Sequence, residues 1–216
     1  MATLLIGSKN YSSWSLRPWL FLRKTDFKFQ EQIVYLDTSG YREQIAALSP
    51  SRRVPLLIDE GVKIWDSIAI CEYAAEAGGR GLPRDRAARA RARSVAAEMH
   101  SGFQALRNEC PMNVRARNLR VPLTEQLKAD IARIDEIWSE CRRDFGGDGN
   151  WLLGEFSIAD AMFAPVCFRF RSYGAALSAV SQSYLEFALQ DQVLRDWQDG
   201  AAKEGHPLPH VDRIGA

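Results

Sequence analysis

Three serines stand close together near the start of the chain, where an anion could be held. Ser12, Ser13 and Ser15 follow a short apolar run, Leu4–Ile6, and precede a second apolar segment, Leu20–Leu22. We interpret the first run as a buried strand and the second as part of a helix, so the serines lie at a strand-to-helix junction. The first turn of a helix has unpaired backbone N–H groups and a partial positive charge. Hydroxyl groups at this place are suited to binding an anion such as a thiolate.

An alternative role for these serines is simply to cap the helix. Serine is a preferred residue at helix starts, where it stabilises the helix by roughly 1 kcal/mol. Pro18 is tolerated near the first turn, because its missing N–H would have no intrahelical partner there. We therefore expect the helix to start at about Ser15. Capping and anion binding both require the serines to lie at this helix start.

The segments that must position the serines predict an α/β domain. We expect a second strand over 28–37, a short helix over 41–48, a hairpin over 56–65 and a helix that begins at Asp66 and Ser67. A strand, a helix and a strand within about 35 residues form a βαβ unit, in which the two strands run parallel. The resulting order, βαβαββα, is the thioredoxin-like arrangement, and we place this domain at residues 1–77.

The rest of the chain has a helical pattern. Residues 78–83 contain three glycines and a proline, so we place a linker at 78–86 and an all-helical domain at 87–216. Long helices are expected over 87–108, 124–145 and 157–173, with one or two more within 183–204. The third of these opens on Ser157 and Asp160, which match a capping box, and we expect a structural role for both. The predicted fold class is thus an α/β domain followed by an all-α domain.

The composition argues against several classes of protein. The chain has 28 Lys and Arg against 27 Asp and Glu, so neither a nucleic acid nor an anionic membrane is expected as its main partner. No apolar run approaches the roughly 20 residues that span a bilayer. The N-terminal residues do not have the pattern of an export signal, and we expect a cytoplasmic protein. Five arginines within 84–93 are interpreted as a solvated helix start or a subunit contact.

The cysteines and histidines do not predict a disulfide or a metal site. Four cysteines are widely separated in the sequence, with no Cys-x-x-Cys pair, and we expect packed free thiols: Cys71, Cys110, Cys141 and Cys167. No group of Cys, His and carboxylate residues has the spacing of metal ligands. We therefore expect that the protein uses no metal.

Four short motifs follow one another at characteristic distances. Residues 12–17 read Ser-Ser-Trp-Ser-Leu-Arg, 49–55 read Ser-Pro-Ser-Arg-Arg-Val-Pro, 66–70 read Asp-Ser-Ile-Ala-Ile and 156–160 read Phe-Ser-Ile-Ala-Asp. In this order they resemble the cytosolic glutathione transferase family, over essentially the whole chain. The first motif is similar to the Ser-Ser-Cys-Ser-x-Arg signature of the zeta class, with Trp14 in the place of cysteine. That departure leaves open whether the chain has the maleylacetoacetate isomerase activity of the zeta class.

The resemblance implies an enzyme that binds glutathione as its co-substrate and activates the thiol for attack on a small electrophile. Ser12 is the residue expected to stabilise the thiolate, and Ser13 is its rival. A serine hydroxyl is not a base at neutral pH, so its role would be to donate a hydrogen bond to the sulfur, whose free pKa is about 8.5. Conjugation, isomerisation and peroxide reduction all fit such a site. The alternative is a related protein that binds a ligand, or regulates, without turnover.

The resemblance also implies a set of glutathione-binding residues. They are Ser12, Trp14, Arg53, Val54, Pro55, Asp66 and Ser67. We expect a cis Val54–Pro55 bond, which would present the Val54 backbone to the cysteinyl part of glutathione like an added strand. Arg53, or Arg52 as its substitute, would pair with the glycine carboxylate.

Asp66 and Ser67 are expected at the γ-glutamyl end of glutathione. Asp66 would attract the γ-glutamyl amine. The Ser67 hydroxyl and N–H group would receive the γ-glutamyl carboxylate at the positive end of the helix, and the same hydroxyl can also cap that helix.

The electrophile is expected between the two domains. Its pocket would be lined by side chains of the first loop and the first long helix: Tyr11, Trp14, Met99, His100, Phe103 and Arg107. Aromatic and sulfur-containing side chains suit an adaptable apolar pocket, although Met99 and Phe103 equally fit the helix-packing core. His100 equally fits a satisfied group between the domains. The expected partners are glutathione, a small electrophile and a second copy of the chain in a homodimer.

Overall fold

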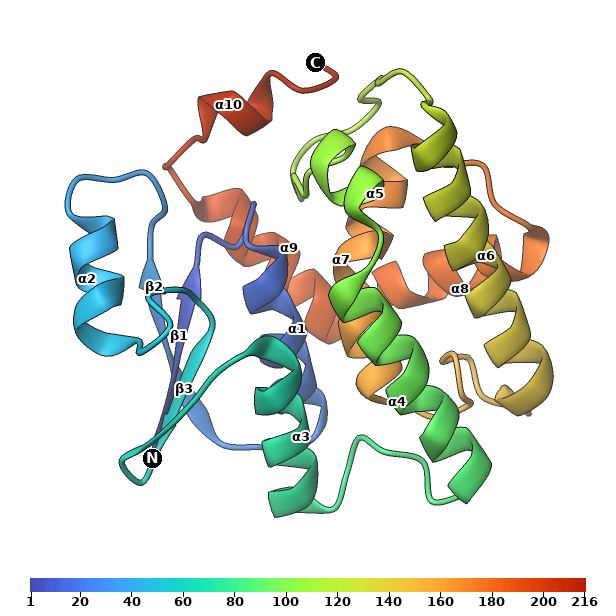
Figure 1. Cartoon of the computed structure of the whole chain (residues 1–216), viewed down its shortest axis with the longest axis horizontal. Coiled ribbons are helices and arrows are strands. Elements are labelled where there is room, and N and C mark those ends of the chain that lie inside the picture. The colour runs from blue at the N-terminus through green and yellow to red at the C-terminus, as the bar shows by residue number, and fades with distance from the viewer.

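The computed structural model describes residues 1–216, with a four-stranded sheet beside a larger group of helices (Figure 1). The strands are β1 (Ala2–Gly7), β2 (Phe29–Val34), β3 (Leu56–Asp59) and β4 (Val62–Ile64). The helices are α1 (Ser13–Lys24), α2 (Tyr41–Leu48), α3 (Ser67–Gly78), α4 (Arg86–Ser101), α5 (Gln104–Glu109), α6 (Glu125–Phe145), α7 (Ile158–Tyr173), α8 (Ala179–Gln190), α9 (Gln192–Lys203) and α10 (Pro209–Asp212). The predicted order βαβαββα is confirmed from β1 to α3.

The sheet has the strand order β2-β1-β3-β4. β1 and β2 are parallel, as the βαβ prediction requires, while β3 is antiparallel to both β1 and β4. β3 and β4 form the predicted hairpin. Its turn contains Glu60 and Gly61, whose φ angles of 48° and 84° are both positive, as a two-residue hairpin turn requires.

The two faces of the sheet are covered by different helices. Leu4 and Ile6 belong to the main hydrophobic core, which includes α1 and α3, whereas Leu5 packs with Leu56 and with Ile45 of α2. This alternation follows from the two-residue period of side chains along a strand. Figure 1 shows α2 on the outer side of the sheet and α1 and α3 on the side toward the helical domain.

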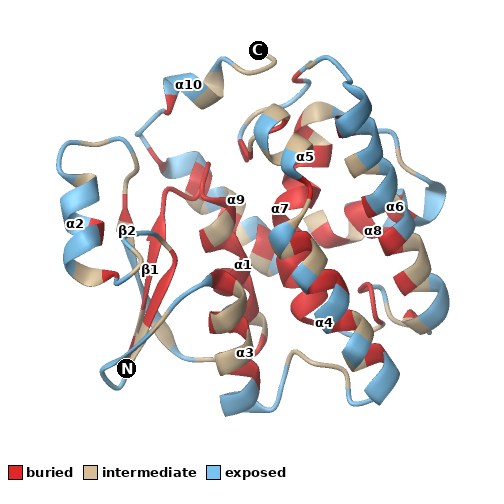
Figure 2. Cartoon of the chain, viewed as in Figure 1, coloured by how far each residue is buried: buried red, intermediate tan, exposed pale blue.

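Helix α1 lies at the centre of the molecule. It packs against α3 in its own domain and against α7 of the helical domain, and both α1 and α7 are almost entirely buried (Figure 2). Trp19 of α1 also meets Trp197 of α9 edge to face, with the ring centroids 5.0 Å apart. A single apolar core therefore extends across both domains and holds them together.

The start of α1 differs from the prediction. The helix begins at Ser13, with Ser12 as its N-cap residue, and not at about Ser15. Pro18 consequently lies inside the helix, where it cannot donate a hydrogen bond to the carbonyl of Trp14. The prediction was wrong because it considered only the helix itself; burial of α1 between α3 and α7 offsets the lost hydrogen bond.

The prediction of a single helix over 87–108 is also wrong. The chain forms two helices, α4 and α5, separated by a break at which Phe103 has a left-handed φ of 61°. The guanidinium of Arg107 turns back and donates to the carbonyls of Met99 and Gly102, the latter at 2.8 Å. Carbonyl groups at the end of α4 are therefore satisfied by a side chain from α5.

The predicted capping box at the start of α7 is confirmed. Asp160 is buried, and its carboxylate accepts hydrogen bonds from the Ser157 N–H at 2.8 Å and the Ser157 hydroxyl at 3.0 Å. It also accepts from the Leu152 N–H at 2.9 Å and from the Tyr184 hydroxyl at 3.1 Å. This one carboxylate thus joins the start of α7 to the preceding loop and to α8.

All four cysteines are free and buried. Burial raises the pKa of the Cys110 thiol to about 11 and that of Cys141 to about 12. It also raises the thiol pKa values of Cys71 and Cys167, so the four thiols have a packing role. None of the helices combines the length and the apolar character that crossing a bilayer would require.

We predict that replacing Asp160 by alanine lowers the free energy of unfolding by about 3 kcal/mol, because buried donors would lose their acceptor. Chemical denaturation at neutral pH measures the change. Asp148→Ala, in an exposed loop, is the matched control and should change stability by no more than about 0.5 kcal/mol. A loss smaller than about 1 kcal/mol for Asp160→Ala would contradict the importance given to this network.

Candidate active site

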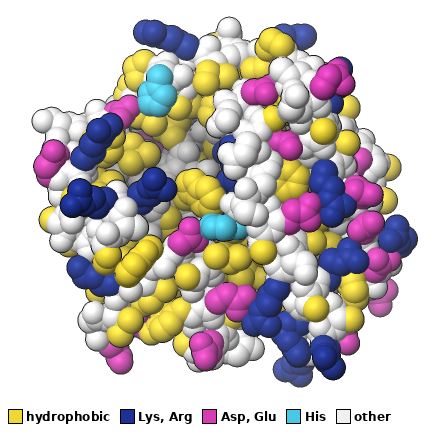
Figure 3. All heavy atoms as spheres, in the orientation of Figure 1, with side chains coloured by type: hydrophobic (Ala, Val, Ile, Leu, Met, Phe, Trp, Pro, Cys, Tyr) yellow, Lys and Arg dark blue, Asp and Glu magenta, His cyan; other side chains and the backbone are white.

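A cavity of about 410 Å³ lies where the two domains meet. It is lined by residues from the start of α1, the loop before β3, the start of α3 and the end of α4: Trp14, Ser51, Arg53, Val54, Pro55, Trp65, Asp66, Ser67 and His100. The structure thus brings together the predicted glutathione-binding residues except Ser12, which does not line the cavity, and adds Ser51 and Trp65. Figure 3 shows a hollow near the centre of this face, with basic side chains on the side of the sheet.

The backbone of Val54 is free within this cavity. The Val54–Pro55 bond is cis, as predicted, and the Trp65–Asp66 bond is cis as well, which nothing in the sequence indicated. The N–H and C=O groups of Val54 make no hydrogen bond with the rest of the chain. A free donor and acceptor on one residue can pair with an extended peptide, as an edge strand does.

Arg53 is the cation of this cavity. It is exposed and lines the cavity, and its guanidinium makes no hydrogen bond or ion pair with the protein. Its own carbonyl accepts a hydrogen bond from the Ser49 hydroxyl at 2.8 Å, which holds the loop in place. Arg52, the predicted substitute, has a left-handed φ of 55° and does not line the cavity.

The start of α3 opens on the same cavity. Asp66 is its N-cap residue, and one carboxylate oxygen accepts the Ile68 N–H at 2.9 Å. Ser67, which is buried, begins the helix, and its hydroxyl lies 3.4 Å from the same oxygen. The partial positive charge of a helix N-terminus therefore lies at this end of the cavity, where a carboxylate would be stabilised.

His100 connects α4 to the start of α3. Its Nε2 atom lies 3.4 Å from the second Asp66 carboxylate oxygen, and its Nδ1 atom is buried without a hydrogen-bond partner. The pKa of His100 is lowered, mainly by burial and further by the charges of Arg17 and Arg107, while Asp66 acts in the opposite direction. The imidazole is thus a predominantly neutral group between the domains at physiological pH.

Two guanidinium groups lie close to the Trp14 ring. The Cζ atoms of Arg17 and Arg107 lie 4.2 Å and 4.8 Å from its ring centroid, within the range of cation–π contacts. Arg17 is fully buried and donates from Nε to the Met162 carbonyl at 3.1 Å. Sequence reasoning treated Arg17 only as part of a motif; its signal is that it is the only charged residue of α1 before Arg23.

The Ser12 hydroxyl and a Val54 methyl group both border Gly7. A Cβ atom on Gly7 would be 3.1 Å from the Ser12 Oγ and 3.2 Å from the Val54 methyl group, so a larger residue would require these neighbours to shift. Ser12 donates to the Ser15 hydroxyl at 2.7 Å, and the Ser15 oxygen also accepts the Gly7 N–H at 3.0 Å.

The Ser13 side chain meets a different helix. Its hydroxyl is 3.4 Å from a guanidinium nitrogen of Arg169 on α7. The two candidate serines therefore face different neighbours: Ser12 borders Gly7, as Val54 does, and Ser13 faces Arg169.

The loop before Ser12 is held by the C-terminal part of the chain. The buried carboxylate of Glu204 accepts the N–H groups of Lys9 at 2.6 Å and of Asn10 at 3.0 Å. The Tyr11 hydroxyl donates to the Asp212 carboxylate, at 2.9 Å from one of its oxygens. Figure 1 shows α10 close to the end of the chain. The serines are thus positioned by residues about 200 positions away in the sequence.

Four of the residues predicted to contact the electrophile do not line this cavity. Tyr11 is engaged with the C-terminal segment, Arg107 is engaged with the end of α4, and Phe103 occupies the break before α5. Met99 is fully buried in the core, which was the alternative for this residue. Of the pocket residues that the sequence indicated, the structure places Trp14 and His100 at the cavity.

Comparison with known proteins identifies the family. Residues 11–77 match the glutathione S-transferase N-terminal domain, and residues 113–205 match the glutathione S-transferase C-terminal domain. A probable maleylacetoacetate isomerase 1 of Drosophila melanogaster is 25% identical, over 77% of this chain and 68% of that protein. The maleylacetoacetate isomerase of Rattus norvegicus is 27% identical, over 71% of this chain and 70% of that protein. The chain belongs to the glutathione transferase family.

Solved structures agree in fold. A glutathione transferase homolog from Burkholderia, with bound glutathione, superimposes with a TM-score of 0.71 at 23% identity, covering 94% of this chain and 99% of that one. The unclassified glutathione S-transferase 2 of Bombyx mori gives a TM-score of 0.72 at 18% identity, covering 100% and 99%. The fold is therefore a thioredoxin-like domain followed by a helical domain, as predicted.

We predict that His100 titrates below pH 6.5 and that Asp66→Asn lowers its pKa further, because the carboxylate stabilises the imidazolium. Between the folded-state pKa and pH 6.5 the folded chain binds fewer protons than the unfolded one, so the stability linked to His100 is fully present above pH 6.5 and is lost as the pH falls through the lower pKa of the folded state. NMR titration of the His100 ring measures both pKa values.

Asparagine at position 66 preserves the cap of α3, because asparagine is also a preferred N-cap residue. Glu76→Gln, on the exposed side of α3, is the control for the loss of one negative charge from this helix. A higher pKa in Asp66→Asn than in the wild type would contradict the proposed pairing.

Proposed function

We propose that this chain is a glutathione-dependent transferase that binds glutathione in the cavity between its domains and stabilises the thiolate through Ser12. One observation carries the proposal: the unpaired backbone of Val54, the unpaired guanidinium of Arg53 and the start of α3 all lie on one cavity. The Val54 backbone matches the peptide bonds of glutathione. Arg53 and the start of α3 match its two carboxylates. The Burkholderia structure that contains glutathione, with a similar fold, supports the proposal.

In the proposed binding mode, each unpaired protein group of the cavity contacts one part of glutathione. The Val54 N–H and C=O pair with the backbone of the cysteinyl residue, as an added strand would. Arg53 pairs with the glycine carboxylate. The γ-glutamyl carboxylate binds at the start of α3 through Ser67, and its amine is attracted by Asp66, of which about half the side chain remains exposed.

The thiolate is stabilised by the hydroxyl pair of Ser12 and Ser15. On binding, the Ser12 proton turns toward the sulfur, and the Ser15 hydroxyl donates to the Ser12 oxygen while still accepting the Gly7 N–H. Hydrogen bonds in such a chain polarise one another. A decrease of one unit in the thiol pKa corresponds to about 1.4 kcal/mol in favour of the thiolate, which is the nucleophile.

The reaction that follows is attack of the thiolate on a small electrophile. Isomerisation is the first reaction to assay, because two similar proteins are named maleylacetoacetate isomerases. Conjugation and peroxide reduction use the same thiolate. Homodimer formation, a cytoplasmic location and the division at 1–77, 78–86 and 87–216 remain predictions.

We predict that Ser12→Ala raises the pKa of bound glutathione by about one unit or more and lowers kcat/KM by about 10- to 100-fold, the loss expected for one hydrogen bond to a charged group. Ser13→Ala is the matched variant and should have a much smaller effect. Ultraviolet titration of the thiolate gives the pKa, and conjugation to an aryl halide gives the rate. Thermal unfolding should be nearly unchanged in Ser12→Ala.

Two outcomes would overturn parts of this proposal. A loss of activity in Ser13→Ala with full activity in Ser12→Ala would make the assignment of Ser12 wrong. A bound thiol with its ordinary pKa of about 8.5 in the wild type would favour a ligand-binding or regulatory protein without turnover.

We predict that Arg53→Gln weakens glutathione binding by about fivefold, equivalent to about 1 kcal/mol for an exposed charge pair. The effect should appear in the dissociation constant and decrease with added salt, while kcat changes little. Arg52→Gln, at the neighbouring exposed arginine, is the matched control. Equal effects of the two substitutions on binding would show that general charge, and not the position of Arg53, is responsible.

A further inference from the structure

Three arginines from three different helices meet at the first turn of α1. Arg17 of α1 and Arg107 of α5 lie close to the Trp14 ring, with their Cζ atoms 4.2 Å and 4.8 Å from its centroid. A guanidinium nitrogen of Arg169 on α7 lies 3.4 Å from the Ser13 hydroxyl. Ser13 and Trp14 are the first two residues of α1, where the helix already has a partial positive charge. The three arginines together are named the arginine cluster.

No member of the arginine cluster is in an ion pair. Arg17 donates to the Met162 carbonyl and Arg169 to the Cys110 carbonyl, at 3.1 Å and 2.8 Å. Arg107 donates to carbonyl groups at the end of α4. Two guanidinium nitrogens of Arg17 and one of Arg169 are buried without any partner. The hydrogen bonds therefore go to neutral groups and leave the three charges uncompensated.

The carboxylates that act on the arginine cluster do not contact it. Asp66 caps α3 and faces His100, and about half of its side chain is exposed. Asp130 of α6 accepts the Leu106 N–H at 2.9 Å. Burial lowers the pKa of all three arginines, and those of Arg17 and Arg169 are lowered further by the neighbouring arginine charges. A guanidinium group nevertheless stays protonated at neutral pH.

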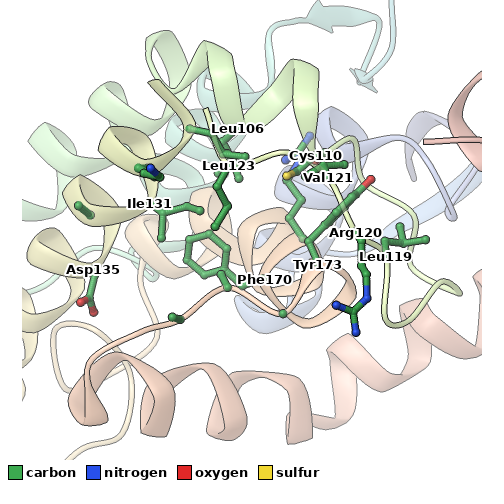
Figure 4. A pocket seen from close by; sticks show the side chains of 17 residues that line it. Leu106, Cys110, Leu119, Arg120, Val121, Leu123, Ile131, Asp135, Phe170 and Tyr173 are labelled. Carbon is green, nitrogen blue, oxygen red and sulfur yellow. Dashed lines mark hydrogen bonds between the residues drawn. The ribbon is translucent and has the colours of Figure 1, made fainter. Parts of the chain in front are cut away.

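The helical domain supplies no anion to Arg169. Burial raises the pKa values of the neighbouring Cys110 thiol and Tyr173 phenol, so both are neutral at physiological pH. Both residues line a cavity of about 520 Å³, and Figure 4 shows Asp135, the one acid of this lining, at the end opposite Cys110. The Asp135 carboxylate accepts the Ser178 hydroxyl at 2.6 Å.

A cluster of this kind can act on a ligand without touching it. The unpaired nitrogens of Arg17 and Arg169 have almost no accessible surface, so a ligand cannot reach them. Charges in a protein interior are weakly screened, however, and interact over several ångströms. An anion at the first turn of α1 would supply the missing negative charge, and the glutathione sulfur is proposed to lie there, at the Ser12 hydroxyl.

We propose that the uncompensated charge of the arginine cluster favours the thiolate of glutathione bound at Ser12, through the electrostatic field and without contact with the sulfur. This role rests on the proposed function of the glutathione cavity, and it gives α5 and α7 a part in thiol ionisation. The thiol proton is released to water. Because the field acts on the charge that ionisation creates, loss of one cation changes the ionisation of the thiol more than the binding of the tripeptide.

Arg107 provides the sharpest test, because it is only half-buried and lysine can keep a positive charge there. Arg107→Gln should raise the pKa of bound glutathione by about half a unit or more, roughly a threefold change in the ionisation constant. Arg107→Lys should stay near the wild type. Ultraviolet titration of the thiolate measures the pKa, and Arg143→Gln, at an exposed position of α6, is the control.

S-methylglutathione separates ionisation from binding, since it keeps both carboxylates and has no ionisable thiol. Its dissociation constant should change by less than about twofold in Arg107→Gln, because only the charge on sulfur is missing from this ligand. Arg169→Gln is the second variant and should raise the thiol pKa by a similar amount. Thermal unfolding shows that each variant is folded before it is titrated.

The His100 imidazole reports on the same charge in the chain without glutathione. Burial is the main cause of its lowered pKa, and the charges of Arg17 and Arg107 lower it further. Arg107→Gln should therefore raise the pKa of His100, and Arg107→Lys should leave it nearly unchanged. NMR titration of the ring measures this shift and requires no ligand.

Four results would overturn the role of the arginine cluster. They are an unchanged thiol pKa in both glutamine variants, equal rises in Arg107→Gln and Arg107→Lys, equal losses of affinity for glutathione and S-methylglutathione, and a His100 pKa that does not rise in Arg107→Gln. A thiol pKa that shifts in Ser12→Ala, but in neither arginine variant, removes this role alone. An ordinary thiol pKa of about 8.5 in the wild type overturns the proposed function, and this role with it.

Discussion

The burial of α1 between α3 and α7 is the interaction on which the rest of the structure depends. It joins the core of the sheet to the core of the helical domain, so the two domains cannot separate without exposing a large apolar surface. Because the start of α1 also holds Ser12 and Trp14, the same packing determines where the site residues lie. The cost of Pro18 within the helix is offset by this burial.

The strand-to-helix junction at the site is held from several directions. Gly7 leaves little room for a larger side chain next to Ser12 and Val54, and Glu204 holds the backbone before the serines. Rigid support of this kind reduces the reorganisation needed when charge develops on a bound sulfur. The groups left unpaired in the cavity, on Val54 and Arg53, are those that a ligand can pair.

Buried arginines distinguish the region where the domains meet. Arg17 and Arg169 are both nearly inaccessible and both have guanidinium nitrogens without partners. The Arg17 guanidinium lies over the Trp14 ring, whereas the Arg169 guanidinium donates to the Cys110 carbonyl and lies near the Ser13 hydroxyl. The two buried cations therefore have different surroundings, although both lie on helices that join the domains.

The sequence by itself determined the order of the elements, the parallel β1–β2 pair and the capping box at Asp160, because local patterns encode these features. The cis bond at Val54 was predicted from the resemblance of a short motif to a known family. It did not determine the break at Phe103, the role of Arg107 in satisfying α4, or the contact of Tyr11 with Asp212. These depend on contacts between residues that only the tertiary structure brings together. The buried state of Arg17 and Arg169 was decided in the same way, since the environment of a charge is set by the helices packed around it and not by its neighbours in the chain.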